Sequence, residues 1–259
     1  MKVLITFALA NEFAPWRKLR PFRSQELGGA DSFVADIGGA QVHVVLTGVG
    51  TKNAGDAASA VIGSESESLG FCVSAGLAGA LRPAYGIGQV LVARAVAPPV
   101  PQGGGAGSEI LCSEALVAFA TEHGATAVDR FHTSGRVIAR AEEKRHLGQS
   151  ADAVEMESFE ILKEAGASGI PAVAIRAISD TANEELPLDM SRIFGDRGQV
   201  SLSGVVAEVA RHPKSLPGLL KLGQQSKLAA ESLAHFLDRY VLSVIERSRD
   251  LHVSAAVAS

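Results

Sequence analysis

The chain has 259 residues, 47% of them hydrophobic and 20% charged, so it is long enough to bury a substantial core. Its net charge of -4, with no Lys/Arg-rich block in the core of the chain, argues against nucleic acid as a partner. Two cysteines and seven histidines show no spacing typical of metal ligands, so we expect reduced thiols and no metal site.

Short apolar runs punctuated by glycine predict strands along most of the chain. The first run, residues 2–10, is too short for a signal peptide or a spanning helix, so we interpret it as a strand of a soluble, cytoplasmic protein. Residues 32–48 resemble a hairpin that turns at Gly38 and Gly39. Further strands are predicted at 41–50, 71–81, 88–97 and 171–180, and Ala-rich helices at 51–63, 113–123 and 156–166. This alternation indicates a three-layer α/β fold, with a central mixed β-sheet covered by helices.

The last part of the chain differs in character from the rest. We therefore divide the chain into an α/β domain over residues 1–185 and a helical C-terminal extension over residues 186–259 packed on it. Three helix-like pieces are predicted in the extension, split at Pro213 and Pro217. The final piece predicts packing on the domain or on a second subunit, because one stripe carries Leu228, Leu233, Phe236, Leu237, Tyr240, Val241, Val244 and Ile245.

Three acidic residues follow apolar runs where predicted strands end. They are Glu12, Glu157 and Asp180. A single acid at such a place is usually a helix cap or a turn residue, and Asp180 with Thr181 could cap a following helix. Ligands of open α/β sheets, however, bind beyond the carboxyl ends of the strands. Three acids at separate strand ends therefore predict one shared crevice.

Two glycine-rich turns are candidates for close contact with a ligand. The stretch TGVGTKNAG, residues 47–55, matches neither the dinucleotide-binding nor the P-loop pattern, so we expect no nucleotide cofactor. Its glycines, Gly50 among them, still allow the backbone to approach a substrate, and a helix from Thr51 offers free N–H groups. The stretch SAGLAGAL, residues 74–81, is a second turn of this kind, and no G-x-S-x-G elbow of an α/β-hydrolase is present.

Six segments, taken in order, carry a resemblance to a known family. They are the first strand with Glu12, TGVGTKNAG, GLAGALRPAYGIGQVLV, SGRVIARAEEK, AVEMES and AIRAISDTA, and they span roughly residues 1–185. As a set they resemble the nucleoside phosphorylase superfamily, in particular the methylthioadenosine/S-adenosylhomocysteine nucleosidases. The resemblance implies cleavage of the N-glycosidic bond of a purine nucleoside by a homo-oligomer, with a dimer favoured. It implies no cofactor, and phosphate as co-substrate only in a phosphorylase.

The resemblance also implies roles for individual residues. Met156 and Glu157 bind the ribose, with Glu157 accepting hydrogen bonds from the 2′- and 3′-hydroxyls, while Glu155 is structural or peripheral. Asp180 protonates purine N7 with Arg176 as its supporting partner, and Glu12 activates water. The other residues implied to bind substrate are Ile138 and Ala139 beside the base, and Gly76, Leu77, Ala78 and Gly79 beside the sugar.

Elementary chemistry agrees with these roles. Breaking a ribosyl C–N bond builds positive charge on the sugar and negative charge on the departing base. Anionic groups must therefore face the sugar and an acid must meet a nitrogen of the base, as in other glycoside hydrolyses. Asp180 must hold a proton in order to donate it, and the apolar strand that precedes it favours the neutral acid.

Two departures from the family pattern concern recognition of the base and the choice between hydrolysis and phosphorolysis. Arg136 stands where the nucleosidases carry an acidic residue, and Leu77 stands where a small hydroxyl residue is frequent. The arginine that phosphorylases carry in the latter turn is missing. Because Glu12 also suits water and repels phosphate, the sequence favours hydrolysis over phosphorolysis.

The extension leaves the substrate and the partners open. From ELPLDM onward it resembles the C-terminal extension of the hopanoid-associated nucleoside phosphorylases, which are implied to remove adenine from an adenosyl-lipid. The 5′ substituent is thus either of the methylthioadenosine type or a bulky apolar polycycle. Peripheral membrane contact through Arg211, Lys214 and Lys221 is a second interpretation of the extension. Outside nucleoside cleavage, the alternatives are a non-catalytic nucleoside-binding protein and a nucleotide-dependent oxidoreductase.

Overall fold

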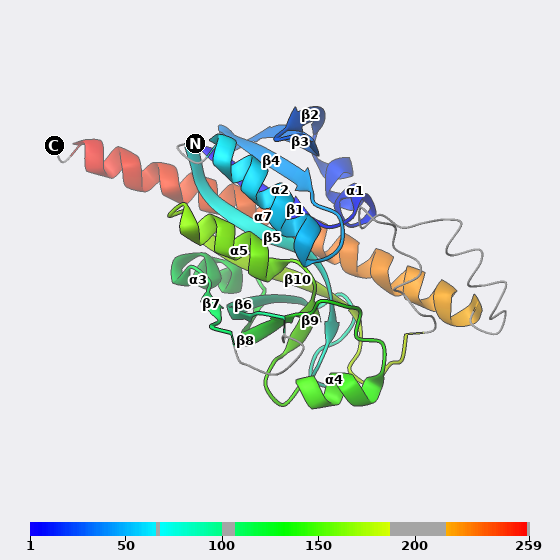
Figure 1. Ribbon diagram of the computed structural model, residues 1–259. Coiled ribbons are helices and arrows are strands. Elements are labelled where there is room, and N and C mark those ends of the chain that lie inside the picture. Colours follow the sequence, from blue (N-terminus) through cyan, green and yellow to red (C-terminus); the bar gives the residue numbers. More distant parts are fainter. Residues whose placement is uncertain (66–67, 100–106, 187–215, 258–259) are drawn as a thin grey trace.

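A computed structural model describes residues 1–65, 68–99, 107–186 and 216–257, the last nine of these by their backbone alone. Within this part of the chain, ten strands form one mixed sheet that lies between layers of helices (Figure 1). The three-layer α/β fold expected from the sequence is confirmed. The strands are β1 (Lys2–Phe7), β2 (Arg23–Leu27), β3 (Ala30–Ile37), β4 (Ala40–Leu46), β5 (Leu69–Ala80), β6 (Val90–Ala97), β7 (Ile110–Leu111), β8 (Thr126–Thr133), β9 (Ala153–Glu155) and β10 (Ala172–Asp180).

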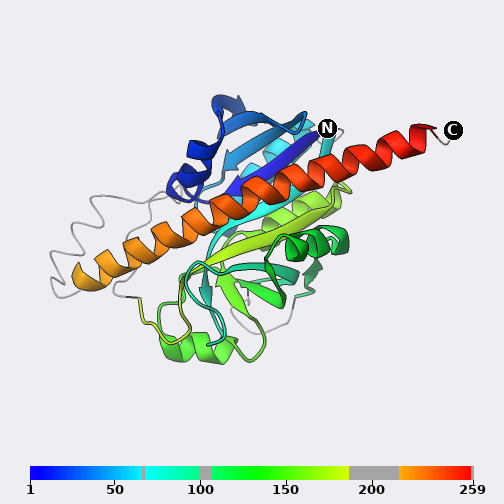
Figure 2. The ribbon, with the colours of Figure 1, turned by 180° about the vertical axis from the view of Figure 1, so that it is seen from behind.

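Six helices accompany these strands in the described residues. They are α1 (Ala10–Leu19), α2 (Thr51–Glu65), α3 (Glu114–Glu122), α4 (Ala141–Leu147), α5 (Ser158–Ala167) and α7 (Leu216–Val257). Helices α2 and α5 pack against each other on the face seen in Figure 1, and α7 crosses the opposite face, as Figure 2 shows. Both faces of the sheet are therefore covered, which explains why β1, β5 and β10 are buried over most of their length.

The strand order brings the ends of distant strands together. The order is β10-β6-β8-β9-β5-β1-β4-β3-β2, and β10 also pairs with β5, so five of the strands close into a ring. Strand β5 runs parallel to β1 and to β10, and the β5–β10 pairing sets Asp180 beside Gly79. The carboxyl ends of β1, β5 and β10 consequently meet at one edge of the sheet.

The predicted hairpin is confirmed. Strands β3 and β4 pair antiparallel, and both turn residues, Gly38 (φ 57°) and Gly39 (φ 79°), have positive φ. Two such residues define a type I′ turn, whose twist matches that of the flanking strands and which favours glycine at both positions.

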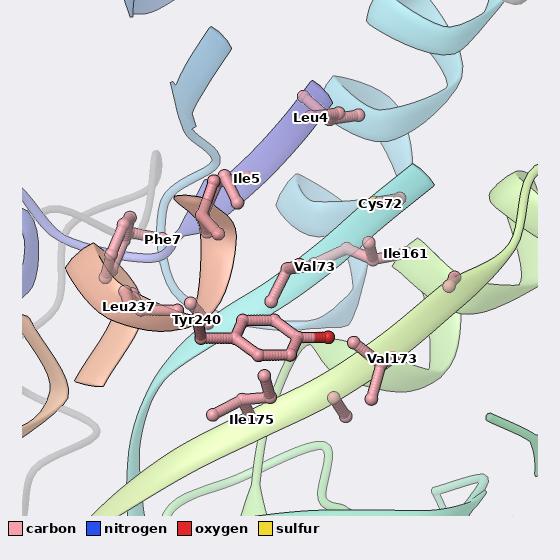
Figure 3. Close-up of a cluster of buried hydrophobic side chains, with 14 of the residues drawn as sticks. Leu4, Ile5, Phe7, Cys72, Val73, Ile161, Val173, Ile175, Leu237 and Tyr240 are labelled. Atoms are coloured by element: carbon pink, nitrogen blue, oxygen red, sulfur yellow. The ribbon is translucent and has the colours of Figure 1, made fainter. Parts of the chain in front are cut away.

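Helix α7 is one continuous helix, so the predicted break at Pro217 is wrong. Pro217 lies in its first turn, where a missing N–H group removes no intrahelical hydrogen bond, while Pro213 lies outside the described residues. Seven of the eight residues of the predicted stripe are buried, but Leu228 is 52% exposed. Figure 3 shows Leu237 and Tyr240 of α7 among apolar side chains of β1, β5 and β10. The packing of the stripe on the sheet therefore makes α7 part of the main core.

Polar contacts fix α7 against two other helices. The Asp238 carboxylate accepts hydrogen bonds from Arg20, at 2.6 and 3.0 Å, and from the Trp16 indole N–H at 3.2 Å. On the other side, the Tyr240 hydroxyl donates to the carbonyl of Leu116 at 3.2 Å. Helices α1 and α7 are thus held together next to the carboxyl end of β1. No helix in the described part of the chain combines the length and the apolarity needed to cross a bilayer.

Candidate active site

A cavity of about 200 Å³ lies where β1, β5, β9 and β10 end. Glu12, Glu157 and Asp180, which are far apart in the sequence, all line it. Each of the three is less than 9% exposed. The predicted meeting of the three acids around one hollow is therefore present in the structure.

Glu12 reaches the cavity from the first turn of α1. One carboxylate oxygen accepts hydrogen bonds from the N–H groups of Ala8 and Leu9, both at 3.1 Å, and the other accepts from Leu77 N–H at 3.4 Å. The bond to Leu9, the N-cap of α1, is one half of a capping box, so Glu12 also stabilises the helix start. Burial raises the pKa of Glu12 above its usual range, against the opposing influence of Arg176 and of these N–H groups. A carboxylate with a raised pKa is a stronger base, as proton removal from water requires.

Glu157 is held at the start of α2. Its Oε1 accepts a hydrogen bond from Gly50 N–H at 2.9 Å, and its Oε2 accepts one from Met156 N–H at 3.3 Å. The free N–H group that we predicted for a ligand at this helix start is thus used by a side chain of the chain itself. Burial and the charge of Glu155 raise the pKa of Glu157 to about 8, although Arg176 and the Gly50 N–H oppose the shift.

The raised pKa of Glu157 makes stability depend on pH. Between about pH 4.5 and about pH 8 the folded chain holds this proton and the unfolded chain has lost it, so the free energy of unfolding falls as the pH rises. We expect Glu157→Gln to remove this contribution. Wild type then loses more stability than the variant between pH 5 and pH 8, so the Tm of the variant minus that of wild type is larger at pH 8. Thermal unfolding at both pH values measures this difference, with Glu26→Gln at an exposed position as control. A Tm difference that is the same at both pH values would contradict the prediction.

Arg176 is not the partner of Asp180, and this expectation is corrected. Its guanidinium is buried and lies 2.6 Å from Oε2 of Glu155 and 3.7 Å from Oε2 of Glu157. It also donates to the carbonyl of Ser74 at 2.8 Å and to the Ser158 hydroxyl at 2.9 Å. Arg176 therefore holds the two glutamates in place from behind the cavity.

Glu155 lines the cavity as well, but its carboxylate is hydrogen-bonded within the chain, as a structural role requires. Its carboxylate accepts hydrogen bonds from the N–H groups of Glu157 and Ser158, at 3.0 and 2.7 Å, and from the Thr133 hydroxyl. Although burial alone would raise the pKa of Glu155, the charge of Arg176 and these hydrogen bonds lower it. Of the two carboxylates on either side of Met156, Glu155 is thus held ionised, whereas Glu157 retains a proton more readily.

The partner of Asp180 is Lys144 of α4, which the sequence did not indicate, so the expectation of an apolar setting for Asp180 is corrected. Lys144 has no exposed surface, and its ammonium contacts Oδ2 of Asp180. The other carboxylate oxygen accepts a hydrogen bond from the Ser179 hydroxyl at 2.9 Å. A side chain at Gly79 would lie 2.8 Å from Oδ2, so only glycine leaves room for the carboxylate here. No helix starts at Asp180 in the described residues, which removes the helix-cap alternative.

The other predicted substrate-binding residues divide into two groups. Five line the cavity, namely Met156, Ile138, Leu77, Ala78 and Gly79. The remaining four are absent from its wall: Gly50 and Arg176 hold Glu157, Gly76 lies behind Glu12, and the carbonyl of Ala139 accepts a hydrogen bond from Leu186 N–H at 3.0 Å. Sequence reasoning missed Val49, Ser179, Leu222 and Ser226, which also line the cavity.

A second, larger cavity of about 650 Å³ continues from the first between α1 and α7. The two cavities share Leu9, Glu12, Leu77, Leu222 and Ser226. The other apolar residues along the larger cavity are Ala14, Pro15, Leu19, Leu219, Ala230 and Ala234. Apart from Glu12, its charged lining residues Lys18, Lys227 and Glu231 are exposed. The site thus opens into an apolar space that a second group could fill. Within the described residues, no three His, Cys, Asp or Glu side chains gather as ligands for a metal ion.

Comparisons with known proteins agree with this geometry. A family model described as the phosphorylase superfamily matches residues 2–211, and no curated protein matches. Similar solved structures include futalosine hydrolase of Helicobacter pylori strain 26695, with a TM-score of 0.73 and 20% identity over 93% of this chain and 97% of that one. They also include the 5′-methylthioadenosine/S-adenosylhomocysteine nucleosidase of Campylobacter jejuni, with a TM-score of 0.70 and 20% identity over 94% and 99% of the two chains. A mutant nucleosidase from Helicobacter pylori, with 5′-methylthioadenosine in its active site, gives a TM-score of 0.72 and 19% identity over 93% and 97%. At these identities the likeness shows a shared fold.

Proposed function

Because the chain belongs to the phosphorylase superfamily, we propose that it cleaves the N-glycosidic bond of a 5′-substituted adenine nucleoside and releases adenine. The observation that carries the proposal is that the buried side chains of Glu12, Glu157 and Asp180 line one cavity. Adenine as the base rests on the resemblance of the sequence to the nucleosidases.

Each acid has a distinct task in this reaction. Asp180 gives a proton to purine N7 as the bond from C1′ to N9 breaks, and the bonding electron pair leaves with the base. Glu157 binds the 2′- and 3′-hydroxyls and lies close to the positive charge that develops on the sugar. Glu12 takes a proton from the water that attacks C1′. General acid and base help of this kind is typically worth ~10²–10⁴-fold in rate for each group.

Water, rather than phosphate, is the acceptor that the charges favour. Two of the three acids, Glu12 and Glu157, flank the sugar position, and an anion is repelled there once they ionise. Among the described residues that line the cavity, Arg136 supplies the positive charge, and its guanidinium is paired with Glu143. The two buried cations beside the cavity are also paired, Arg176 with Glu155 and Lys144 with Asp180.

The proposal is tested by incubating the protein with 5′-substituted adenosines and measuring free adenine. We expect adenine and a free pentose without phosphate, and the same products when phosphate is added. Ribose 1-phosphate as the product would reassign the reaction to phosphorolysis. Saturable nucleoside binding without release of adenine from any substrate would support a non-catalytic nucleoside-binding protein instead.

The larger cavity favours a bulky apolar group at the 5′ carbon, as in adenosylhopane. A methylthio group brings only one sulfur and one methyl carbon. Since a water molecule has a share of about 30 Å³ of liquid volume, a space of about 650 Å³ has room for ~20 non-hydrogen atoms. The walls near the junction, Leu9, Leu77 and Leu222, are apolar and suit a hydrocarbon. The second candidate function is therefore removal of adenine from an adenosyl-lipid in hopanoid biosynthesis.

Narrowing the larger cavity separates the two candidate substrates. Ala230 is buried on α7 and lines the larger cavity but not the smaller one. If the 5′ group occupies this space, Ala230→Phe raises KM for an adenosine with a long 5′-alkylthio chain about 10-fold or more, because hydrophobic pockets discriminate by such factors. The KM for methylthioadenosine stays unchanged.

Gly223→Ala serves as the matched control for this experiment. Gly223 lines the same cavity, and a Cβ there meets no atom within 4 Å. It should therefore leave both KM values at the wild-type level. Equal effects of Ala230→Phe on the two substrates would place the 5′ group elsewhere.

A further inference from the structure

Lys144 is a buried cation directly behind the candidate acid. Lysine is almost never fully buried unless it is paired, and Lys144 has no exposed surface. Its ammonium donates to the carboxylate of Asp180, to the carbonyl of Thr181 at 3.1 Å and to the carbonyl of Glu184 at 2.9 Å. These three acceptors match the three N–H bonds of an ammonium group, so the charged form is fully hydrogen-bonded.

The arrangement leaves Lys144 outside the cavity while Asp180 faces into it. Lys144 is absent from the cavity wall, whereas Ser179 and Asp180 are both part of it. Two of the acceptors of Lys144 are backbone carbonyls, so the ammonium keeps partners whether Asp180 is neutral or charged. A buried ion pair can often be replaced by apolar residues without loss of stability, so stability alone does not account for a lysine at this place.

We propose that Lys144 is a positioning residue for departure of the base, an inference that rests on the proposed function. Its ammonium fixes the Asp180 carboxyl toward N7 and stabilises the carboxylate left after the proton has moved. In that step the C1′–N9 electron pair moves onto the purine, the Asp180 proton moves to N7, and the new carboxylate faces Lys144. The carboxylate regains a proton from solvent after adenine has left.

A pair of substrates with different leaving groups tests this role. Adenine needs a proton on N7 to depart, whereas the phenolate of 4-nitrophenyl β-D-ribofuranoside leaves without one. We expect Lys144→Met to lower kcat for the adenine nucleoside about 10²-fold, the lower end of the range for general acid catalysis. The rate for the nitrophenyl riboside and the KM for the nucleoside change little. Lys144→Arg, which keeps the positive charge, restores most of the adenine release.

The difference between the two leaving groups is the measurement that a purely structural role of Lys144 would not give, because a disturbed fold in Lys144→Met would slow both reactions. Thermal unfolding shows whether the variant folds. If it does not, Lys144→Gln, which keeps hydrogen-bond donors for the carbonyls of Thr181 and Glu184, takes its place.

The outcomes separate this inference from the proposed function. Equal losses for the two substrates, or unchanged adenine release in the folded variant, would overturn the role of Lys144 and leave the proposed function intact. A wild-type protein that releases no adenine from any 5′-substituted adenosine would overturn both.

Discussion

Asp180→Asn is expected to lower the kcat for adenine release ~10²–10⁴-fold, the contribution typical of a general acid. An amide has nearly the shape of the carboxyl group. Its oxygen can still accept a hydrogen bond from Lys144 and its NH2 group can donate to the Ser179 hydroxyl, but it has no acidic proton for N7. The KM for the nucleoside should therefore stay close to the wild-type value. Steady-state measurement of free adenine gives both parameters.

A stability measurement must accompany the Asp180→Asn experiment. The substitution leaves the ammonium of Lys144 buried without its counter-charge, and loss of one partner of a buried ion pair typically costs about 3–5 kcal/mol. The double variant Asp180→Asn with Lys144→Met removes both charges, so it lacks the acid without leaving an unpaired buried ammonium. Its activity shows whether the loss in Asp180→Asn comes from the missing acid or from a destabilised fold. Asp36→Asn, at an exposed carboxylate of β3, is the control and should retain wild-type activity. A folded Asp180→Asn protein with wild-type kcat would exclude Asp180 as the acid.

Glu12→Gln is expected to lower hydrolysis by a similar ~10²–10⁴-fold, because an amide cannot take the proton of the attacking water. The amide oxygen can still accept hydrogen bonds from Ala8 and Leu9, so the start of α1 should keep its structure. Free adenine and pentose are measured without phosphate, with Glu26→Gln on the exposed edge strand β2 as the control.

Glu12→Gln also tests whether water or phosphate attacks the sugar. Glu12→Gln removes a negative charge from the position that the attacking group occupies, so any phosphorolysis should survive the substitution or increase. We expect no ribose 1-phosphate when phosphate is added. Hydrolysis at the wild-type rate would show that Glu12 does not activate the water.

Long apolar runs made most of the fold predictable. The sequence predicted strands β5 and β10 because each is buried on both faces and therefore forms a nearly continuous apolar run without the alternation of a half-exposed strand. Strand β9 has three residues, Ala153–Glu155, too few for any pattern to emerge. The continuity of α7 through Pro217 was missed because a proline in the first helical turn looks the same in sequence as one that ends a helix.

The acids of the site were predictable, but their partners were not. Glu12, Glu157 and Asp180 stand out because each follows an apolar run, and the parallel strands carry them to one edge. Arg176 and Asp180 are four residues apart on β10, and regular alternation would place them on one face. The pairing of β10 with β5 is irregular between Ile178 and Asp180, and Arg176 binds Glu155 instead. Lys144 comes from a short charged helix, where nothing in the sequence separates a buried lysine from an exposed one.

Helix α7 is constrained by packing in the core along its middle and by contact with the cavities near its start. From Phe236 to Ile245 its inward-facing residues belong to the core, and changes there threaten the whole fold. Leu219, Leu222 and Ser226, nearer its start, line the cavities and do not belong to that core. Relatives that act on different substrates should therefore diverge within the opening turns of the helix while its middle stays fixed. A library randomised at these three positions alone would be a compact means of changing substrate preference.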